Sequence, residues 1–104
     1  MGLLQDAGYD GFDWDAGNSL KNWERHHVSR RETEEVFSNR PWYDYKAEGY
    51  VGNEKRSIVL GKTDKGRALF IVYTERNNRI RPISARDMYR TERKLYDEKT
   101  KTIT

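Results

Sequence analysis

The hydrophobic positions of this chain follow a helical spacing in its first half and a strand-like alternation in its second half. Residues 1–11 show neither spacing and are expected to form a loose lead-in. Phe12 and Trp14 alternate with aspartates, which favours a short first strand. The predicted order of elements is β-α-α-β-β-β-α, which indicates an α+β fold with two N-terminal helices, a mostly antiparallel sheet and a C-terminal helix.

The first predicted helix begins at Asn18 or Ser19, because either side chain can accept a hydrogen bond from a backbone amide of the first turn. Leu20 and Trp23 stand three residues apart and should form its apolar face. We expect the helix to end near residues 26 and 27, which are adjacent histidines.

A second helix should follow almost at once. Ser29 and Glu32 have the spacing of a capping box, in which the serine hydroxyl accepts the amide of Glu32 and the glutamate reaches back to the serine amide. This helix would bury Val36 and Phe37, and the sequence Asn39-Arg40-Pro41 would end it.

The next segment has the alternation and the turn residues of a sheet. Residues 42–47 are rich in aromatic side chains and should be extended, whereas residues 48–53, with two glycines, favour a loop. Residues 56–60 predict a strand, and residues 63–66 predict a hairpin turn with a glycine available for the left-handed conformation. Residues 67–75 hold the longest apolar stretch, which predicts a central strand covered on both faces.

The last strand is expected over residues 79–83, after a turn made by two asparagines. Pro82 cannot donate a hydrogen bond to a neighbouring strand, so it should lie at an edge or in a bulge. Ser84 can then cap a final helix that carries Met88 and Tyr96 among its apolar positions.

With 104 residues the chain can form one small domain, which we expect to comprise residues 12–98, between the lead-in and a frayed tail at residues 99–104. The longest apolar run, Ala68 to Tyr73, is far shorter than the roughly 20 residues of a membrane helix. The N-terminus lacks a signal-peptide pattern. Cysteine is absent, which excludes disulfides, thiol catalysis and cysteine-ligated zinc, and suits the cytoplasm.

Charge is divided unevenly along the chain. Residues 1–54 hold 6 Lys and Arg against 11 Asp and Glu, whereas residues 55–104 hold 14 against 6, so the two halves carry −5 and +8. Such a division can present a phosphate-binding face. It is equally suited to binding an acidic partner protein.

Four arginines lie on or beside the hairpin predicted around residues 77–78. They are Arg76, Arg79, Arg81 and Arg86. Planar guanidinium groups on a sheet suit phosphate contacts, but charge at a sheet edge also protects against aggregation. On composition alone the protective role is slightly the better explanation, and the basic second half of the chain shifts the balance toward phosphate binding.

RNA cleavage without metal needs a base for the 2′-hydroxyl, an acid for the leaving 5′-oxygen and cations that stabilise the extra charge on phosphorus. His26 and His27 point about 100° apart on a helix, so at most one can face a given site. Glu75 is an alternative base, and Tyr96 could stack on a nucleobase or donate a proton. Each of these residues also has a purely structural explanation. A histidine is favoured at a helix end, Glu75 can be an ion-pair partner, and Tyr96 can be a packing residue.

The other motifs are unspecific. Glycine-rich phosphate loops are missing from the sequence. Asp13 and Asp15 share one face of the predicted first strand, but two acids alone do not define a metal site, and Asp15 is better explained as a helix cap. We expect neither a cofactor nor a metal.

Several short motifs carry a resemblance when they are taken in order. They are Phe12-Asp13-Trp14-Asp15, Asn22 followed by Arg25-His26, Val28-Ser29, Glu35-Val36-Phe37, Glu54-Lys55-Arg56, Leu60-Gly61, Tyr73-Thr74-Glu75-Arg76, Arg79-Ile80-Arg81, Ile83-Ser84-Ala85-Arg86 and Glu92-Arg93 with Tyr96. With this order and spacing, residues 12–98 resemble the BrnT-type toxins of bacterial type II toxin–antitoxin systems. His27 stands where this family usually has glycine.

The resemblance implies a RelE-like fold and a ribonuclease activity that arrests growth. It also implies neutralisation by a cognate antitoxin with a ribbon-helix-helix DNA-binding part. The complex of toxin and antitoxin would repress its own operon, so the toxin would meet DNA only through the antitoxin. No membrane partner is expected.

Chemistry and resemblance together give two sets of candidate residues. The catalytic set is His26, Glu75, Arg76, Arg81, Arg86 and Tyr96. The set for RNA phosphate is Arg25, Arg56 and Arg79. The alternative function is a non-catalytic basic module that binds an acidic partner protein or a nucleic acid.

Overall fold

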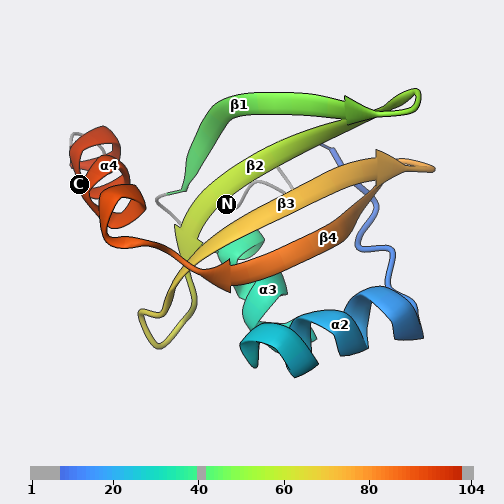
Figure 1. The fold of residues 1–104 in the computed structure, drawn as a ribbon, viewed down its shortest axis with the longest axis horizontal. Helices are drawn as coiled ribbons and strands as arrows, with labels where there is room; N and C mark the ends of the chain where they lie inside the picture. The colour runs from blue at the N-terminus through green and yellow to red at the C-terminus, as the bar shows by residue number, and fades with distance from the viewer. Residues whose placement is uncertain (1–7, 40–41, 102–104) are drawn as a thin grey trace.

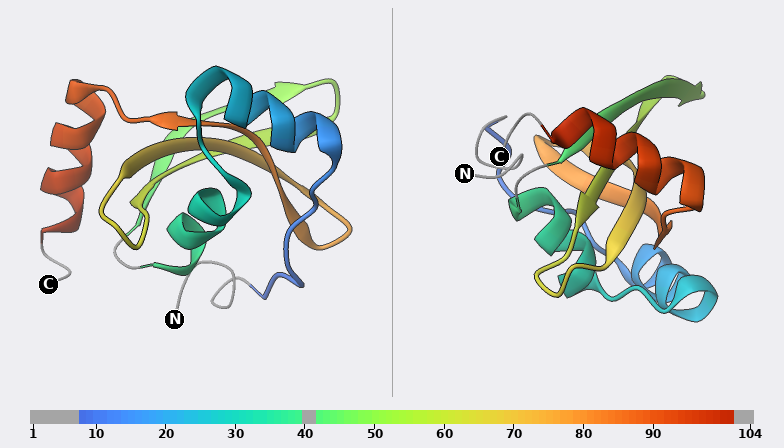
Figure 2. Two further views of the ribbon diagram at one scale, coloured as in Figure 1. Left: turned by 90° about the horizontal axis from the view of Figure 1, so that it is seen from below. Right: turned by 90° about the vertical axis from the view of Figure 1, so that its left-hand side faces the viewer.

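The computed structural model describes residues 8–39 and 42–101, apart from the side chains at positions 20, 46–48, 50 and 51. Four antiparallel strands form one sheet in the order β1-β2-β3-β4. Helices α2 and α3 pack on one face of the sheet, and α4 lies against one end of the other face (Figure 1 and Figure 2). The elements are α2 (Ala16–His26), α3 (Arg30–Ser38), β1 (Tyr43–Val51), β2 (Glu54–Lys62), β3 (Ala68–Arg76), β4 (Arg79–Asp87) and α4 (Arg90–Thr100). The predicted α+β arrangement is confirmed, and it is consistent with a RelE-like fold.

Both N-terminal helices begin at a capping box. The Asp15 carboxylate accepts the amide of Asn18 at 2.9 Å, and the Asn18 side-chain oxygen accepts the amide of Asp15 at 2.7 Å. The prediction of Asp15 as a helix cap is therefore confirmed, and the prediction of a cap at Asn18 or Ser19 is wrong. The box predicted for α3 is confirmed, because Ser29 and Glu32 exchange two hydrogen bonds of 3.1 Å.

Helix α2 docks on β4 through buried amide side chains. Asn18 Nδ2 donates to the carbonyl of Pro82 at 3.0 Å, and Asn22 Oδ1 accepts the amide of Ala85 at 3.0 Å. Trp23, predicted for an apolar inner face with Leu20, is instead 52% exposed, while the side chain of Leu20 lies outside the described part. The prediction for Trp23 is wrong because β4 is an outer strand, whose outward backbone groups need hydrogen-bond partners.

The outer edge of β4 is covered by the chain that leads into α2. The amide of Ile80 donates to the carbonyl of Gly11 at 2.9 Å, and the carbonyl of Ile80 accepts the amide of Asp13 at 2.8 Å. Phe12 forms a single parallel bridge to Ile80. The predicted first strand is reduced to this bridge, and we call residues 10–13 the N-terminal clamp.

Strand β1 is longer than predicted. It continues to Val51, where the sequence favoured a loop, and the turn into β2 uses Gly52 with a φ of 63°. The predicted hairpin turn between β2 and β3 is confirmed, with Gly66 at a φ of 86°. The central strand is confirmed as β3, which pairs on both sides.

Strand β4 and the final helix also differ from the prediction. The pairing with β3 shifts register between Val72 and Tyr73, so Pro82 lies at the predicted bulge. Beyond the bulge the pairing resumes, and Ser84 pairs with Val72 instead of capping a helix. Strand β4 therefore continues to Asp87, and α4 begins only at Arg90.

The core consists of two hydrophobic clusters on opposite faces of the sheet. The cluster under α2 and α3 contains Val28, Val36, Phe37, Val59, Leu69, Ile71, Tyr73, Ile80 and Ala85. The cluster under α4 contains Leu60, Met88 and Tyr96. The predicted burial of Val36 and Phe37 is confirmed. Within the described residues, no helix has the length and apolar character needed to cross a bilayer.

Candidate active site

Five of the predicted arginines share one face of the sheet, because opposite residues in antiparallel strands point to the same side. They are Arg56, Arg76, Arg79, Arg81 and Arg86. The face lies opposite α2 and α3, and α4 covers one end of it (Figure 2). We call this the open face.

Glu54 joins two of these arginines at the open face. Its Oε2 accepts a hydrogen bond of 2.9 Å from Nε of Arg76, and its Oε1 lies 3.5 Å from Nη2 of Arg56. The Arg76 side chain is 48% exposed. Nε of Arg56 is buried and has no hydrogen-bond partner among the described residues. Both arginines therefore have donor capacity that Glu54 does not use.

Arg81 is positioned by two aspartates from the chain that leads into α2. Its Nη2 donates to Oδ2 of Asp15 at 2.8 Å, and its Nη1 lies 3.5 Å from Oδ1 of Asp13. The same Asp15 caps α2 through its other oxygen. The start of the helix and the orientation of the arginine therefore depend on one carboxylate.

The charges of these groups act on one another. The hydrogen bond from Arg76 lowers the pKa of Glu54, and the positive charges of Arg56 and Arg81 lower it further. The same hydrogen bond raises the pKa of Arg76. Glu54 is therefore an ionised proton acceptor at neutral pH, surrounded by three cations. We call Arg56, Arg76 and Arg81 the arginine cluster.

Arg86 is held differently, near the N-terminus of α4. Its Nη1 and Nη2 donate to the two oxygens of Glu92 at 2.8 and 2.9 Å. Its guanidinium carbon lies 3.9 Å from the ring centroids of both Phe70 and Tyr89. Only 18% of the Arg86 side chain is exposed. The charge of Arg86 is thus paired and its planar faces are covered.

The sequence model of a known family matches most of the chain. It is described as ribonuclease toxin, BrnT, of type II toxin-antitoxin system, and it covers residues 14–92. The chain belongs to the BrnT family. As a member of this family the protein is a ribonuclease toxin, and its partner is a cognate antitoxin. No curated protein matches the chain significantly.

Two residues predicted for this BrnT toxin lie on α2, away from the arginine cluster. Arg25 is exposed, and His26 is the last residue of the helix. The carbonyl of His26 accepts a hydrogen bond of 3.1 Å from Arg67. The His26 side chain lies close enough to Asp87 to contribute to the lowered pKa of that carboxyl. Asp87 pairs with Leu69 on β3. Leu69 is seven residues from Arg76, so the two positions are about 23 Å apart along the strand. The structure therefore does not bring His26 to the cluster.

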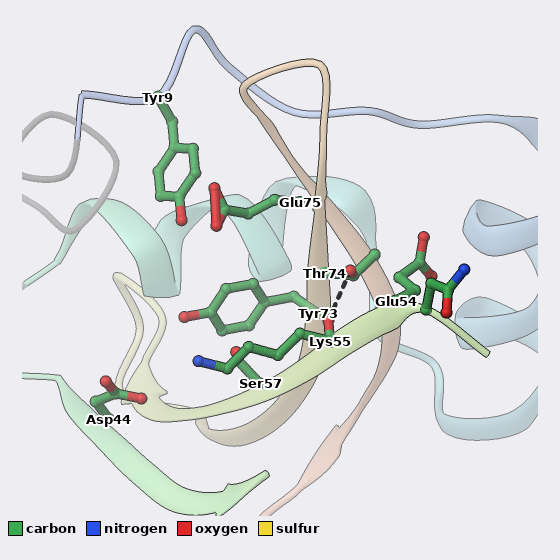
Figure 3. A pocket seen from close by; sticks show the side chains of 9 residues that line it. Tyr9, Asp44, Glu54, Lys55, Ser57, Tyr73, Thr74 and Glu75 are labelled. Atoms are coloured by element: carbon green, nitrogen blue, oxygen red, sulfur yellow. Dashed lines mark hydrogen bonds between the residues drawn. The ribbon is translucent and has the colours of Figure 1, made fainter. Parts of the chain in front are cut away.

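Glu75 lies on the other face of the sheet from its neighbour Arg76. It lines a pocket of about 640 Å³ with Tyr9, Asp44 and Tyr73, among other residues (Figure 3). Burial and a hydrogen bond with Glu75 raise the pKa of Tyr9 to about 12. Burial raises the pKa of Tyr73 as well. Glu54 also lines this pocket, so a BrnT mechanism that uses Glu75 would act next to the arginine cluster.

Tyr96 and Arg79 complete the predicted set. Tyr96 is 3% exposed on the side of α4 that faces the sheet, where burial raises its pKa. A nucleobase cannot stack on this ring unless α4 moves. Arg79 is exposed at the β3–β4 turn, directly opposite Arg76. Of the nine predicted residues, the structure thus brings Arg56, Arg76 and Arg81 together, with Arg79 paired to Arg76 at the turn.

Sequence reasoning missed Glu54 as a site residue in this BrnT toxin. The signal was present, because Glu54 and Arg56 are two residues apart on one strand and therefore share a face. The contact with Arg76 depends on the pairing of β2 with β3 and was not visible in the sequence. Among residues 8–39 and 42–101, the His, Asp and Glu side chains form no group of three or more that could hold a metal ion.

Proposed function

We propose that this toxin cleaves RNA at the open face, without a metal ion, through the arginine cluster and Glu54. The observation that carries the proposal is the placement of the Glu54 carboxylate against Arg76 and Arg56, with Arg81 close enough to lower its pKa. Arg56 and Arg76 supply the charge stabilisation that phosphoryl chemistry needs, and Arg81 adds to it although its charge is paired with Asp13 and Asp15. The ionised carboxylate supplies a base.

In the proposed reaction, the RNA 2′-oxygen attacks the adjacent phosphorus and its proton passes to Glu54. The arginine cluster binds the non-bridging oxygens, whose negative charge increases in the transition state. The bond from phosphorus to the 5′-oxygen then breaks, and the leaving oxygen takes a proton from the solvent at the open face. The products are a 2′,3′-cyclic phosphate and a free 5′-hydroxyl, and Glu54 returns its proton to solvent.

The finer properties of the partner are part of the same proposal. The antitoxin carries a ribbon-helix-helix DNA-binding part, and the complex represses its own operon, so DNA is contacted only through the antitoxin. The toxin acts in the cytoplasm, where its RNA substrate is, and growth stops when the antitoxin is lost. Membership of a type II toxin family supports these statements, together with the motif resemblance.

The test is cleavage of RNA by the full chain, purified free of antitoxin, in excess EDTA. We expect cleavage to continue, with cyclic phosphate and 5′-hydroxyl ends on the fragments. A reaction that stops in EDTA and returns with one particular metal would overturn the metal-free mechanism. Salt-sensitive RNA binding without any cleavage would favour the non-catalytic binding module.

A further inference from the structure

The stack that contains Arg86 ends in an aromatic ring that is open to solvent. Tyr89 packs against the Arg86 guanidinium on one side, yet the residue is 62% exposed. Its backbone amide donates to Oε1 of Glu92 at 2.7 Å, and the same carboxylate binds Arg86. The stack is therefore fixed at its base and open at its outer end.

We infer that Tyr89 is a stacking platform for an unpaired base of the RNA substrate. The base would continue the stack of Phe70, Arg86 and Tyr89 by packing on the outer face of the Tyr89 ring. The inference rests on the proposed function, because it assumes that RNA phosphates occupy the arginine cluster. Aromatic side chains bind single-stranded RNA in this way, since each base offers a π-face. A ring that is already fixed loses little conformational entropy when a base stacks on it.

The position of Tyr89 relative to the arginine cluster suits such a platform. Arg86 and Arg81 are opposite Phe70 and Thr74, which are four residues apart on β3, or about 13 Å. The platform and the cluster therefore lie along one face, at a separation that a short stretch of nucleotides can bridge. The substrate class is single-stranded RNA, because a base within a duplex cannot offer its face to a side chain.

Trp23 shows that exposure alone does not make a platform. It is 52% exposed, but it belongs to α2, which packs on the other face of the sheet, and its ring contacts His27 at a centroid distance of 5.3 Å. Trp23 is therefore the matched control: a large, exposed aromatic residue of the same chain on the wrong face.

The experiment compares two probes that share one backbone. The first is a short single-stranded RNA whose 2′-oxygens are methylated, so that it cannot be cleaved, and the second is its abasic counterpart. We expect Tyr89→Ala to lower the affinity for the base-bearing probe by roughly 5- to 100-fold and to leave the affinity for the abasic probe unchanged. Tyr89→Trp should restore binding, and Trp23→Ala should bind both probes like the wild type.

Two further measurements separate failure of this inference from failure of the proposed function. Thermal unfolding of each variant shows whether the fold is retained, and Arg76→Ala should weaken the binding of both probes. If Arg76→Ala weakens both probes while Tyr89→Ala weakens neither, or weakens both equally, the stacking platform is overturned and the phosphate site stands. If Arg76→Ala binds both probes like the wild type, the phosphate site itself is overturned.

Discussion

The arginine cluster and Arg67 show how the same side chain can serve two purposes in one small domain. Arg67 donates to the backbone carbonyls of His26 and His27 and to the carboxylates of Glu32 and Asp87, at 2.7 to 3.1 Å. These partners join α2, α3 and β4. In the arginine cluster the partners are carboxylates at a solvent-facing surface, and the Arg76 side chain is 48% exposed. Arg67 is thus used for assembly, whereas the cluster keeps capacity for a ligand.

The comparison predicts that changes at the open face reduce activity and leave stability almost unchanged. The largest effect is expected for Glu54→Gln, which removes the proposed base and should lower single-turnover cleavage by roughly 10²–10⁴-fold. Because its pKa is lowered, the wild-type rate should fall only as the pH drops below the ordinary glutamate value of about 4.3.

His26→Ala provides the competing test of the same step. If His26 transfers the proton, as the sequence suggested, His26→Ala should lower single-turnover cleavage by roughly 10²–10⁴-fold. Normal cleavage by Glu54→Gln, together with loss in His26→Ala, would move the chemistry to the end of α2.

Arg76→Ala should reduce cleavage by roughly 10²–10³-fold, the usual effect of removing one donor that stabilises transition-state charge. Its affinity for RNA should also depend less steeply on salt, because one phosphate contact is lost. Arg31→Ala is the control, since this side chain is 88% exposed on α3. Equal cleavage rates in the two variants would contradict the assignment of the cluster.

Arg67→Ala should show the opposite pattern. We expect it to lower the free energy of unfolding by roughly 2 kcal/mol, because several charged hydrogen bonds are lost, while the folded fraction still cleaves RNA. The hydrogen bond from Arg67 lowers the pKa of Asp87, so this stabilisation is present at neutral pH. It should be lost as the pH falls through that lowered value. Denaturant unfolding at pH 7 and below pH 4 measures the difference, which should shrink in acid.

The smallest effect is expected at His27, beside the Arg67 network. This residue has a φ of 51° after the end of α2, a conformation that glycine adopts more easily. His27→Gly should raise the free energy of unfolding by roughly 0.5–1 kcal/mol. The gain is reduced by the loss of the ring contact between His27 and Trp23. Glu24→Gly, within the same helix, should lower it by about 1 kcal/mol. Destabilisation by both glycines would show that the left-handed turn carries no strain.

The sequence was informative where local chemistry decides the structure. The α3 capping box, the glycine of the β2–β3 turn and the bulge at Pro82 follow from a few neighbouring residues. These features need no knowledge of distant contacts.

Predictions were wrong where long-range contacts decide the outcome. Ser84 has the chemistry of a helix cap, but pairing with Val72 keeps it in a strand. Trp23 follows a helical spacing, but α2 docks through Asn18 and Asn22. The arginines were visible in the sequence, whereas Glu54 became part of the site only through the pairing of β2 with β3.

The N-terminal clamp also has a consequence for how copies of this chain can associate. A sheet with two open edges can recruit strands on both sides and grow into a filament. Here the clamp bonds the backbone of β4 at Ile80, and Asn18 and Asn22 bond it at Pro82 and Ala85, whereas within the described residues β1 has an outer side with no strand paired to it. A chain with one open strand edge can pair edge to edge with only one other chain. Such association therefore ends at a closed dimer, and the sheet cannot act as a polymer subunit.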